Sequence, residues 1–145
     1  MPQVFKKLTF NSSQKNFIEI TSDIKRELDT LNMQNGLINI SVLHTSCSLL
    51  IQENADPSVQ LDIKNFLEEI APEKNYIHSS EGADDMPAHL KSLLTQTHIS
   101  LSFKDKKLIL GTWQGIFLLE HRVSDKIRNV ELHLMGRCRI KVLDG

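Results

Sequence analysis

Residues 76–91 are the stretch that most limits how this chain can fold. Between Tyr76 and Lys91 the chain places two histidines, three carboxylates and one lysine around a glycine and a proline. Unpaired charges are costly to bury, so this stretch is excluded from the interior of a sheet or a buried helix. Two interpretations remain: a solvated loop that opens a helix, or a loop that carries metal or phosphate ligands into a cleft.

The chain before this stretch combines short strands with two amphipathic helices. Residues 3–10 and 17–20 predict the two strands of a hairpin, and residues 37–43 alternate apolar and polar side chains as a half-buried strand does. A first helix is predicted from residue 21 or 22 to Asn35-Gly36, which favours a helix end. A second helix begins at Asp56-Pro57 and is predicted to face the core with Val59, Ile63, Phe66, Leu67 and Ile70.

The chain after this stretch is dominated by strands. A third helix is predicted to begin near Asp85 and to turn Leu90, Leu93 and Leu94 inward. Further strands are predicted at 99–103, 108–110, 116–119 and 130–134, with a loop at 123–129. The sum is an α+β fold: one compact domain over residues 1–145, with a mostly antiparallel or mixed sheet core and about three helices.

Composition limits the partners that this chain can have. A net charge of -1 gives no global reason to bind nucleic acid or an anionic membrane, so any anion site must be local. The sequence shows no apolar run of the roughly 20 residues that a membrane span needs and no signal-peptide run at its start, which predicts a cytoplasmic protein. The two cysteines, Cys47 and Cys138, have no metal-binding spacing and read as small apolar residues.

Polar residues also interrupt the predicted strands at two other places. His44-Thr45-Ser46 separates two apolar runs, and Gly111 to Gly115 interrupts the later sheet. Histidines and carboxylates suit a divalent cation, whereas hydroxyls, lysine and arginine suit phosphate oxygens. For His44 two interpretations stay open, a ligand aimed out of a strand break or a hydrogen-bonded histidine that shapes the loop.

Together these polar segments resemble a known family. The motifs are His-Thr-Ser-x-Ser-Leu at 44–49, Glu-Asn-x-Asp-Pro at 53–57, His-x-x-Glu-Gly-Ala-Asp-Asp-Met-Pro-x-His-x-Lys at 78–91, and Gly-Thr-Trp-Gln-Gly-Ile with Glu-His-Arg at 111–122. Their order and spacing are similar to those of the YjbQ family of secondary thiamine-phosphate synthase enzymes over essentially the whole chain. One departure is Ser124-Asp125-Lys126, which replaces a His-Gly-Gly often found there.

The resemblance implies a homotrimer whose polar segments gather in one cleft at a subunit boundary. The implied reaction joins hydroxymethylpyrimidine diphosphate to hydroxyethylthiazole phosphate, giving thiamine phosphate and pyrophosphate. A divalent metal ion, with Lys91 and Arg122, would neutralise charge on the leaving pyrophosphate. The expected partner is therefore a phosphorylated small molecule.

The residues that match the family's polar positions divide into three expected roles. The expected catalytic residues are Glu81, Asp84, Asp85, Lys91, Glu120 and Arg122. The expected substrate-binding residues are Thr45, Ser46, Asn54, Thr112, Trp113, Gln114 and Arg128. The expected metal ligands are His44, His78 and His89, with zinc or nickel suited to imidazoles and magnesium to carboxylates.

Two other functions use the same residues. A metal-dependent phosphohydrolase would need the same ion and the same phosphate contacts. A metal- or phosphometabolite-binding protein would bind without turnover.

Overall fold

The longest described strand, β8 (Lys126–Arg137), lies inside a five-stranded antiparallel sheet, one strand from its edge, in this computed structural model, which describes residues 1–138. It pairs with β1 (Gln3–Ser12) on one side and with β3 (Asn35–Val42) on the other. The sheet continues through β5 (His98–Lys104) and β6 (Lys107–Leu108). Residues 139–145 of the predicted domain lie outside the described residues.

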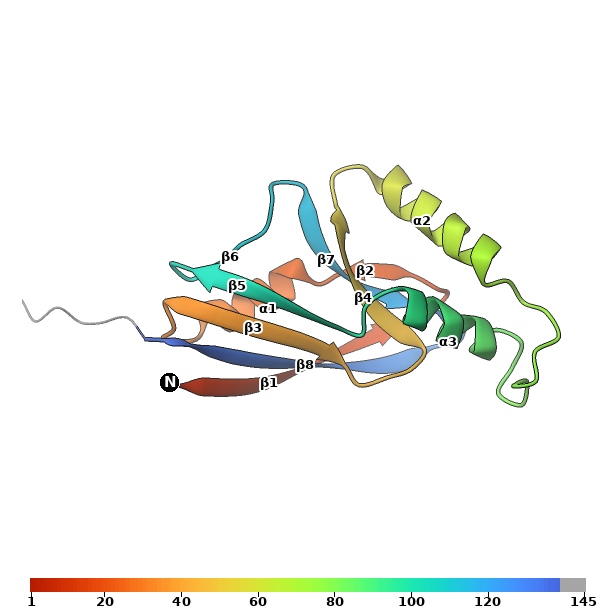
Figure 1. Cartoon of the computed structure of the whole chain (residues 1–145), viewed down its shortest axis with the longest axis horizontal. Coiled ribbons are helices and arrows are strands. Elements are labelled where there is room, and N and C mark those ends of the chain that lie inside the picture. The colour runs from red at the N-terminus through yellow and green to blue at the C-terminus, as the bar shows by residue number, and fades with distance from the viewer. Residues whose placement is uncertain (139–145) are drawn as a thin grey trace, which may run out of the picture.

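A second, smaller antiparallel sheet lies beside the first (Figure 1). Its central strand β7 (Gln114–Glu120) pairs with β2 (Phe17–Glu19) and with β4 (Cys47–Glu53). Residues 115–120 of β7 are all buried, which agrees with the continuous apolar run in its sequence. β4 and β7 run in opposite directions, so Cys47 faces Glu120 at one end and Glu53 faces Gln114 at the other.

Helix α1 (Thr21–Asp29) completes the main hydrophobic core. Its residues Ile24 and Leu28 are one turn apart and fully buried, as the helical spacing predicts. They pack in one cluster with β3, β4, β7 and β8, which includes Ile38, Leu49, Leu118 and Leu132. The predicted α+β class, with three helices and antiparallel strands in the described chain, is therefore confirmed.

Helix α2 (Pro57–Ile70) begins as predicted but does not bury the predicted stripe. The Asp56 carboxylate accepts a hydrogen bond from the Ser58 backbone N–H at 2.9 Å and so caps the helix. Only Leu67 is buried, while Phe66 and Ile70 are 58% and 52% exposed. The prediction of a core-facing stripe is wrong because α2 extends along the outside of the molecule (Figure 1).

Helix α3 (Asp85–Leu94) also differs from its prediction. The residues that it buries include Asp85, Lys91 and Ser92, whereas Leu93 and Leu94 are 67% and 49% exposed. The prediction that Leu93 and Leu94 turn inward is wrong. The polar residues of α3 turn inward instead, because they bind the Cys47 carbonyl on β4, Glu68 on α2 and Arg122 in the chain after β7.

The last strand is longer than predicted. β8 begins at Lys126, so only the first residues of the predicted 123–129 loop are outside the sheet. No helix within residues 1–138 has the length and apolar character needed to cross a membrane.

Candidate metal centre

Three side chains from the polar stretch converge at the start of α3. Asp85 and His89 are one helical turn apart on the same face, and His78 lies on the loop before the helix. The Asp85 Oδ2 atom lies 2.6 Å from His78 Nε2 and 3.2 Å from His89 Nε2. One donor atom from each residue falls within 4.8 Å of the others, so these three side chains could hold a metal ion.

The backbone of Thr45 fixes the orientation of the His89 ring. His89 Nδ1 lies 2.8 Å from the Thr45 carbonyl oxygen, and a carbonyl can only accept, so Nδ1 carries the proton of the neutral ring. The other nitrogen, Nε2, then points a lone pair at the Asp85 carboxylate. Two lone pairs at this distance repel each other unless a cation or a second proton lies between them. This donor set fits a metal ion.

Arg122 holds the acidic start of α3 from a distant part of the sequence. Its Nη1 donates to Asp85 Oδ1 at 2.6 Å and its Nε donates to Asp84 Oδ2 at 3.1 Å. Its Nη2 donates to the Glu81 carbonyl, while the Glu81 side chain is exposed. Because Arg122 occupies Oδ1 of Asp85, only Oδ2 faces the two imidazoles.

Gly82 makes this contact with Arg122 possible. Its φ is +109°, a left-handed conformation that a residue with a Cβ adopts only with strain. A Cβ there would also lie 3.3 Å from Asp84 Oδ1 and 3.7 Å from the Arg122 guanidinium. The glycine of the polar stretch therefore turns the chain back towards Arg122.

The environment keeps Asp85 ionised although the residue is almost fully buried. Burial alone would raise its pKa, but the hydrogen bond from His78 and the charge of the Arg122 guanidinium outweigh burial. The pKa of Asp85 is therefore below its ordinary value. A buried carboxylate that stays charged is a suitable metal ligand.

The structure does not bring His44 into this ligand set. Its Nε2 accepts a hydrogen bond from the Asn129 backbone N–H at 2.8 Å. A backbone amide can only donate, so the proton of the neutral His44 ring lies on Nδ1, and neither nitrogen offers a free lone pair. His44 nevertheless lines a cavity together with Thr45 and His89.

Lys91 faces away from the histidines, on the opposite side of α3. It is 2% exposed, and its Nζ donates to Glu68 Oε1 on α2 at 2.5 Å. Burial lowers its pKa, and the hydrogen bond to Glu68 only partly restores it. Lys15 also lies 3.0 Å from Glu68 Oε1, so Lys91 belongs to an ion-pair network with Glu68 and Lys15 rather than to the histidine cluster.

Glu120 and Arg128 form a second buried ion pair beneath the segment between β3 and β4. Arg128 donates to both Glu120 carboxylate oxygens and also to Ser46 through Nη2. Ser12 donates to Glu120 Oε1 at 2.5 Å. Both charged residues are at most 4% exposed. Their hydrogen bonds therefore stabilise the loop that contains His44 and Thr45.

Four expected substrate-binding residues lie at the other end of β4 and β7: Asn54, Thr112, Trp113 and Gln114. The Trp113 carbonyl accepts from the Asn54 N–H, and the Trp113 side chain is 64% exposed. Six residue steps along the strand pair separate this group from Cys47 and Glu120, or about 20 Å. One chain therefore does not gather all the expected residues in one cleft.

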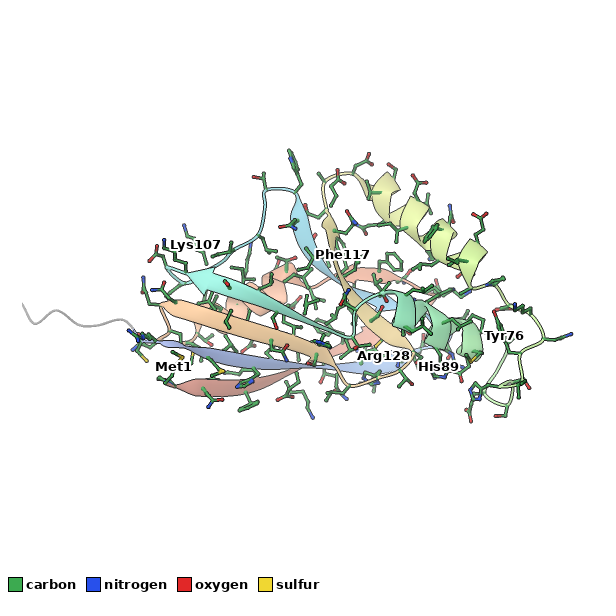
Figure 2. All side chains as sticks on the ribbon, in the orientation of Figure 1. Met1, Tyr76, His89, Lys107, Phe117 and Arg128 are labelled. Atoms are coloured by element: carbon green, nitrogen blue, oxygen red, sulfur yellow. The ribbon has the colours of Figure 1, made fainter. Side chains whose placement is uncertain are left out.

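The fold and the cluster define an α+β protein with a two-histidine, one-carboxylate site at the end that carries α3. His89 lies at this end, with Tyr76 on the loop beyond it, and Lys107 lies towards the opposite end (Figure 2). The chain belongs to the YjbQ family: residues 6–137 match the model described as UPF0047 protein YjbQ-like.

Relatives of known sequence and structure agree with this assignment. The chain is 42% identical to UPF0047 protein sll1880 of Synechocystis over 131 residues, covering 89% of each. It is 38% identical to UPF0047 protein YjbQ of Escherichia coli O157:H7, covering 90% of this chain and 96% of that protein. A conserved hypothetical protein of Thermus thermophilus has a similar crystal structure, with a TM-score of 0.80, 35% identity, and coverage of 90% and 99%.

A structure from Sulfolobus solfataricus, described as a YbjQ-like protein of unknown function, matches the fold with a TM-score of 0.86. Its identity is 20%, and the match covers 94% of this chain and 99% of that one. These relatives establish the family and the fold, and the family is one of unknown function.

Several groups that shape the site were not found by sequence reasoning. The Thr45 carbonyl, the Asn129 N–H and the Val123 N–H, which donates to Asp84 Oδ2, are backbone groups that carry no sequence signal. Glu68, the partner of Lys91, lies on the second predicted helix among other acidic residues. The sequence signal that does indicate the site is the spacing of Asp85 and His89, which places both side chains on one face of a helix.

Proposed function

We propose that this chain is a metal-dependent enzyme whose ion is held by His78, Asp85 and His89 and which acts on phosphorylated small molecules. The observation that carries the proposal is the His89 ring, whose Nδ1–H is taken by the Thr45 carbonyl. In the neutral ring, Nε2 therefore faces the ionised Asp85 carboxylate at 3.2 Å with a lone pair and no proton to donate. A divalent cation between them would remove the repulsion.

Two imidazoles and one carboxylate favour zinc or nickel over magnesium, which prefers oxygen ligands. When bound, such an ion supplies a Lewis acid for phosphate oxygens. Arg122 would keep Asp85 in place, and the Thr45 carbonyl would keep Nε2 of His89 free of its proton. A geometry of this kind acts by positioning, as a pre-organised site does.

Thiamine-phosphate synthesis is the reaction that we propose for this site. The thiazole nitrogen attacks the methylene carbon of the pyrimidine, and the bond from that carbon to the diphosphate oxygen breaks. The electron pair leaves with pyrophosphate, so the reaction needs charge neutralisation and little acid–base catalysis. Because Lys91 and Arg122 are engaged with carboxylates, the metal would carry most of this neutralisation. We propose that it acts in the cytoplasm.

We also propose that the active form is a homotrimer. Asn54, Thr112, Trp113 and Gln114 lie about 20 Å along the β4–β7 pair from Cys47 and Glu120, at the end away from Thr45, which contacts His89. A second copy could bring this group beside the metal centre, and the exposed Trp113 would be covered there. Light scattering should give three times 16.5 kDa at micromolar concentration, whereas a mass of 16.5 kDa would refute the trimer.

The direct test combines metal content with turnover. Protein purified without chelators should contain about one zinc or nickel ion per chain, and the Asp85→Asn and His89→Ala variants should lose it. With both thiamine precursors, only metal-loaded wild type should form thiamine phosphate above a denatured control. His98→Ala, at an exposed position that begins β5, is the matched control and should behave as wild type. Metal without product would refute the transferase and leave the metal site.

A metal-dependent phosphohydrolase is the second candidate. One observation favours it. The two side chains expected to bind phosphate, Lys91 and Arg122, are already paired with the carboxylates of Glu68 and Asp85. Three protein ligands of zinc usually leave a position for water, which the ion makes nucleophilic. Phosphate release from a panel of phosphoesters, lost in Asp85→Asn, would support this function. Tight ligand binding with no product from either assay would instead indicate a binding protein.

A further inference from the structure

A cavity lies on the His89 side of the proposed metal centre. Its volume is about 250 Å³, and it is lined by the segment between β3 and β4, by α3 and by the residue before β5: His44, Thr45, His89, Ser92, Leu93 and Thr97. This is somewhat smaller than typical cavities for drug-sized ligands, so one ring with short substituents fits. His89 belongs to both the cavity and the metal-ligand set, so a ligand here would lie beside the ion.

The polar groups of this cavity are mostly engaged by the protein itself. Ser92 Oγ donates to the Cys47 carbonyl at 3.2 Å, and the Thr45 carbonyl accepts from His89. Leu93 is 67% exposed and contributes apolar surface. No carboxylate, lysine or arginine is among the residues that line the cavity, so neither a cation nor an isolated phosphate is favoured there.

His44 offers a hydrogen-bond donor whose position is fixed. Its Nε2 accepts from the Asn129 N–H, so Nδ1 carries the proton, and no residue within 1–138 accepts a hydrogen bond from Nδ1. Burial, and then the charge of Arg128, lowers the pKa of His44 and keeps the ring neutral. A neutral N–H of this kind pairs with an uncharged acceptor such as a heteroaromatic nitrogen.

We propose that this cavity binds a single-ring nitrogen heterocycle, with a ring nitrogen accepting from His44 Nδ1–H and the ring packed against Leu93. The phosphorylated substituent would extend past His89 to the metal centre. The inference deepens the proposed function and rests on it for the reacting group. Recognition of the ring rests on His44 alone and can be measured without metal or turnover.

The first experiment observes His44 directly. Long-range ¹H–¹⁵N spectra of ¹⁵N-histidine-labelled protein, assigned by comparison with a His44 variant, should show the Nδ1–H tautomer of a neutral ring. Adding 4-amino-2-methyl-5-hydroxymethylpyrimidine without phosphate should shift this signal with saturation at millimolar concentration. Two results would overturn the proposal. One is an Nε2–H tautomer of His44. The other is a His44 signal that stays unchanged at a pyrimidine concentration that saturates the shifts of other cavity residues.

The second experiment separates the donor from the fold. In His44→Gln the amide oxygen can accept from the Asn129 N–H, so the variant should fold as wild type, and the ring N–H at Nδ1 is removed. We expect it to bind the pyrimidine at least tenfold more weakly, and His44→Phe to do the same if it folds. His98→Gln is the matched control on β5 and should bind normally. Equal pyrimidine affinity in wild type and His44→Gln would overturn the proposal.

A third comparison tests the ring nitrogen. Benzyl alcohol has a similar ring without a nitrogen, so wild type should prefer the pyrimidine and His44→Gln should lose that preference. Pyrimidine binding without thiamine phosphate formation would support the cavity and refute the transferase. Transferase activity that does not depend on His44 would refute the cavity and leave the transferase.

Discussion

Helices α1 and α3 bury opposite kinds of side chain. α1 buries Ile24 and Leu28 in the main core and exposes its charges. α3 buries Asp85, Lys91 and Ser92 and exposes Leu93 and Leu94. The first arrangement stabilises the fold through non-directional apolar contact, whereas the second depends on hydrogen bonds and ion pairs with defined partners.

This difference indicates what each helix contributes. Apolar packing tolerates small displacements, but the contacts of α3 with Arg122, Glu68 and the Cys47 carbonyl fix its position along particular directions. Such precision suits a helix that presents Asp85 and His89 as ligands. Its exposed leucines are left for a ligand or for another copy of the chain.

The largest effect is expected on the α1 side. Ile24→Ala removes a fully buried side chain from the main core and should lower the free energy of unfolding by about 3 kcal/mol. Urea denaturation at pH 7.5 would measure this loss, and metal affinity of the folded variant should be unchanged. A loss of metal binding in folded Ile24→Ala would show that the two sides of the molecule are coupled.

The ion pair behind α3 should respond asymmetrically. Glu68→Gln leaves Lys91 buried with a weaker partner and should cost about 2 kcal/mol, less than for a fully buried pair because the Glu68 side chain is 37% exposed and screened. Lys91→Met removes the buried charge and should cost less than Glu68→Gln. The same urea measurements decide the order, and a larger cost for Lys91→Met would mean that the pair itself stabilises α3.

Mild acid should destabilise the polar side of the molecule through His121. This residue is 1% exposed beside Ser48, and burial followed by the charge of Lys91 lowers its pKa from 6.5 to about 3. The folded state therefore stays neutral at His121, while the unfolded state binds a proton as pH falls below 6.5. Stability from this residue is complete above pH 6.5 and decreases by about 1.4 kcal/mol per pH unit below it.

The measurement is urea unfolding at pH 7.5, 6.0 and 5.0, which should show a loss of about 2 kcal/mol over this range. His121→Gln keeps a polar group near Ser48 but does not titrate, so its loss should be much smaller. His44 has a lowered pKa as well and contributes in the same direction, so the difference between variant and wild type is the diagnostic quantity. If the free energy of unfolding fell equally with pH in wild type and His121→Gln, His121 would be excluded as the cause of the acid destabilisation.

The smallest effect is expected at the exposed face of α3. Leu94→Gln should change the stability of a single chain by less than about 0.5 kcal/mol, because the side chain is half exposed. Thermal unfolding at several protein concentrations would measure this. A larger loss that grows on dilution would show that another copy covers this face.

Apolar periodicity predicted several elements, but the hairpin predicted for residues 3–10 and 17–20 is wrong, because β1 pairs with β8 in one sheet and β2 with β7 in the other. The spacing of Ile24 and Leu28 placed the start of α1, although the helix ends at Asp29 and the predicted stop, Asn35-Gly36, instead begins β3. The alternation of Ile38, Ile40 and Val42 placed β3 with the correct face buried. These predictions succeed because burial of apolar area follows a fixed period in each element. Apolar periodicity did not predict the buried faces of α2 and α3. Those faces depend on polar contacts between the helices, such as the one between Lys91 on α3 and Glu68 on α2.

The site was predictable only in part for a similar reason. Asp85 and His89 share a helix face, and His78 lies close in sequence, so a cluster of these residues could be expected. Arg122 lies 37 positions from Asp85, and no local pattern joins the two. The atom that His44 binds, the Asn129 backbone nitrogen, is common to nearly every residue type, so periodicity and motif spacing do not indicate it.

The Thr45 carbonyl that orients His89 has a consequence for how this site tolerates mutation. A main-chain oxygen is present whichever amino acid occupies position 45, so saturation mutagenesis there should leave the His89 tautomer intact for every residue that accepts the local backbone conformation. Most single-base changes in the codon for residue 45 should therefore leave the orientation of His89, a proposed metal ligand, unchanged. Genetic screens that score side chains would therefore overlook position 45 even though His89 depends on it.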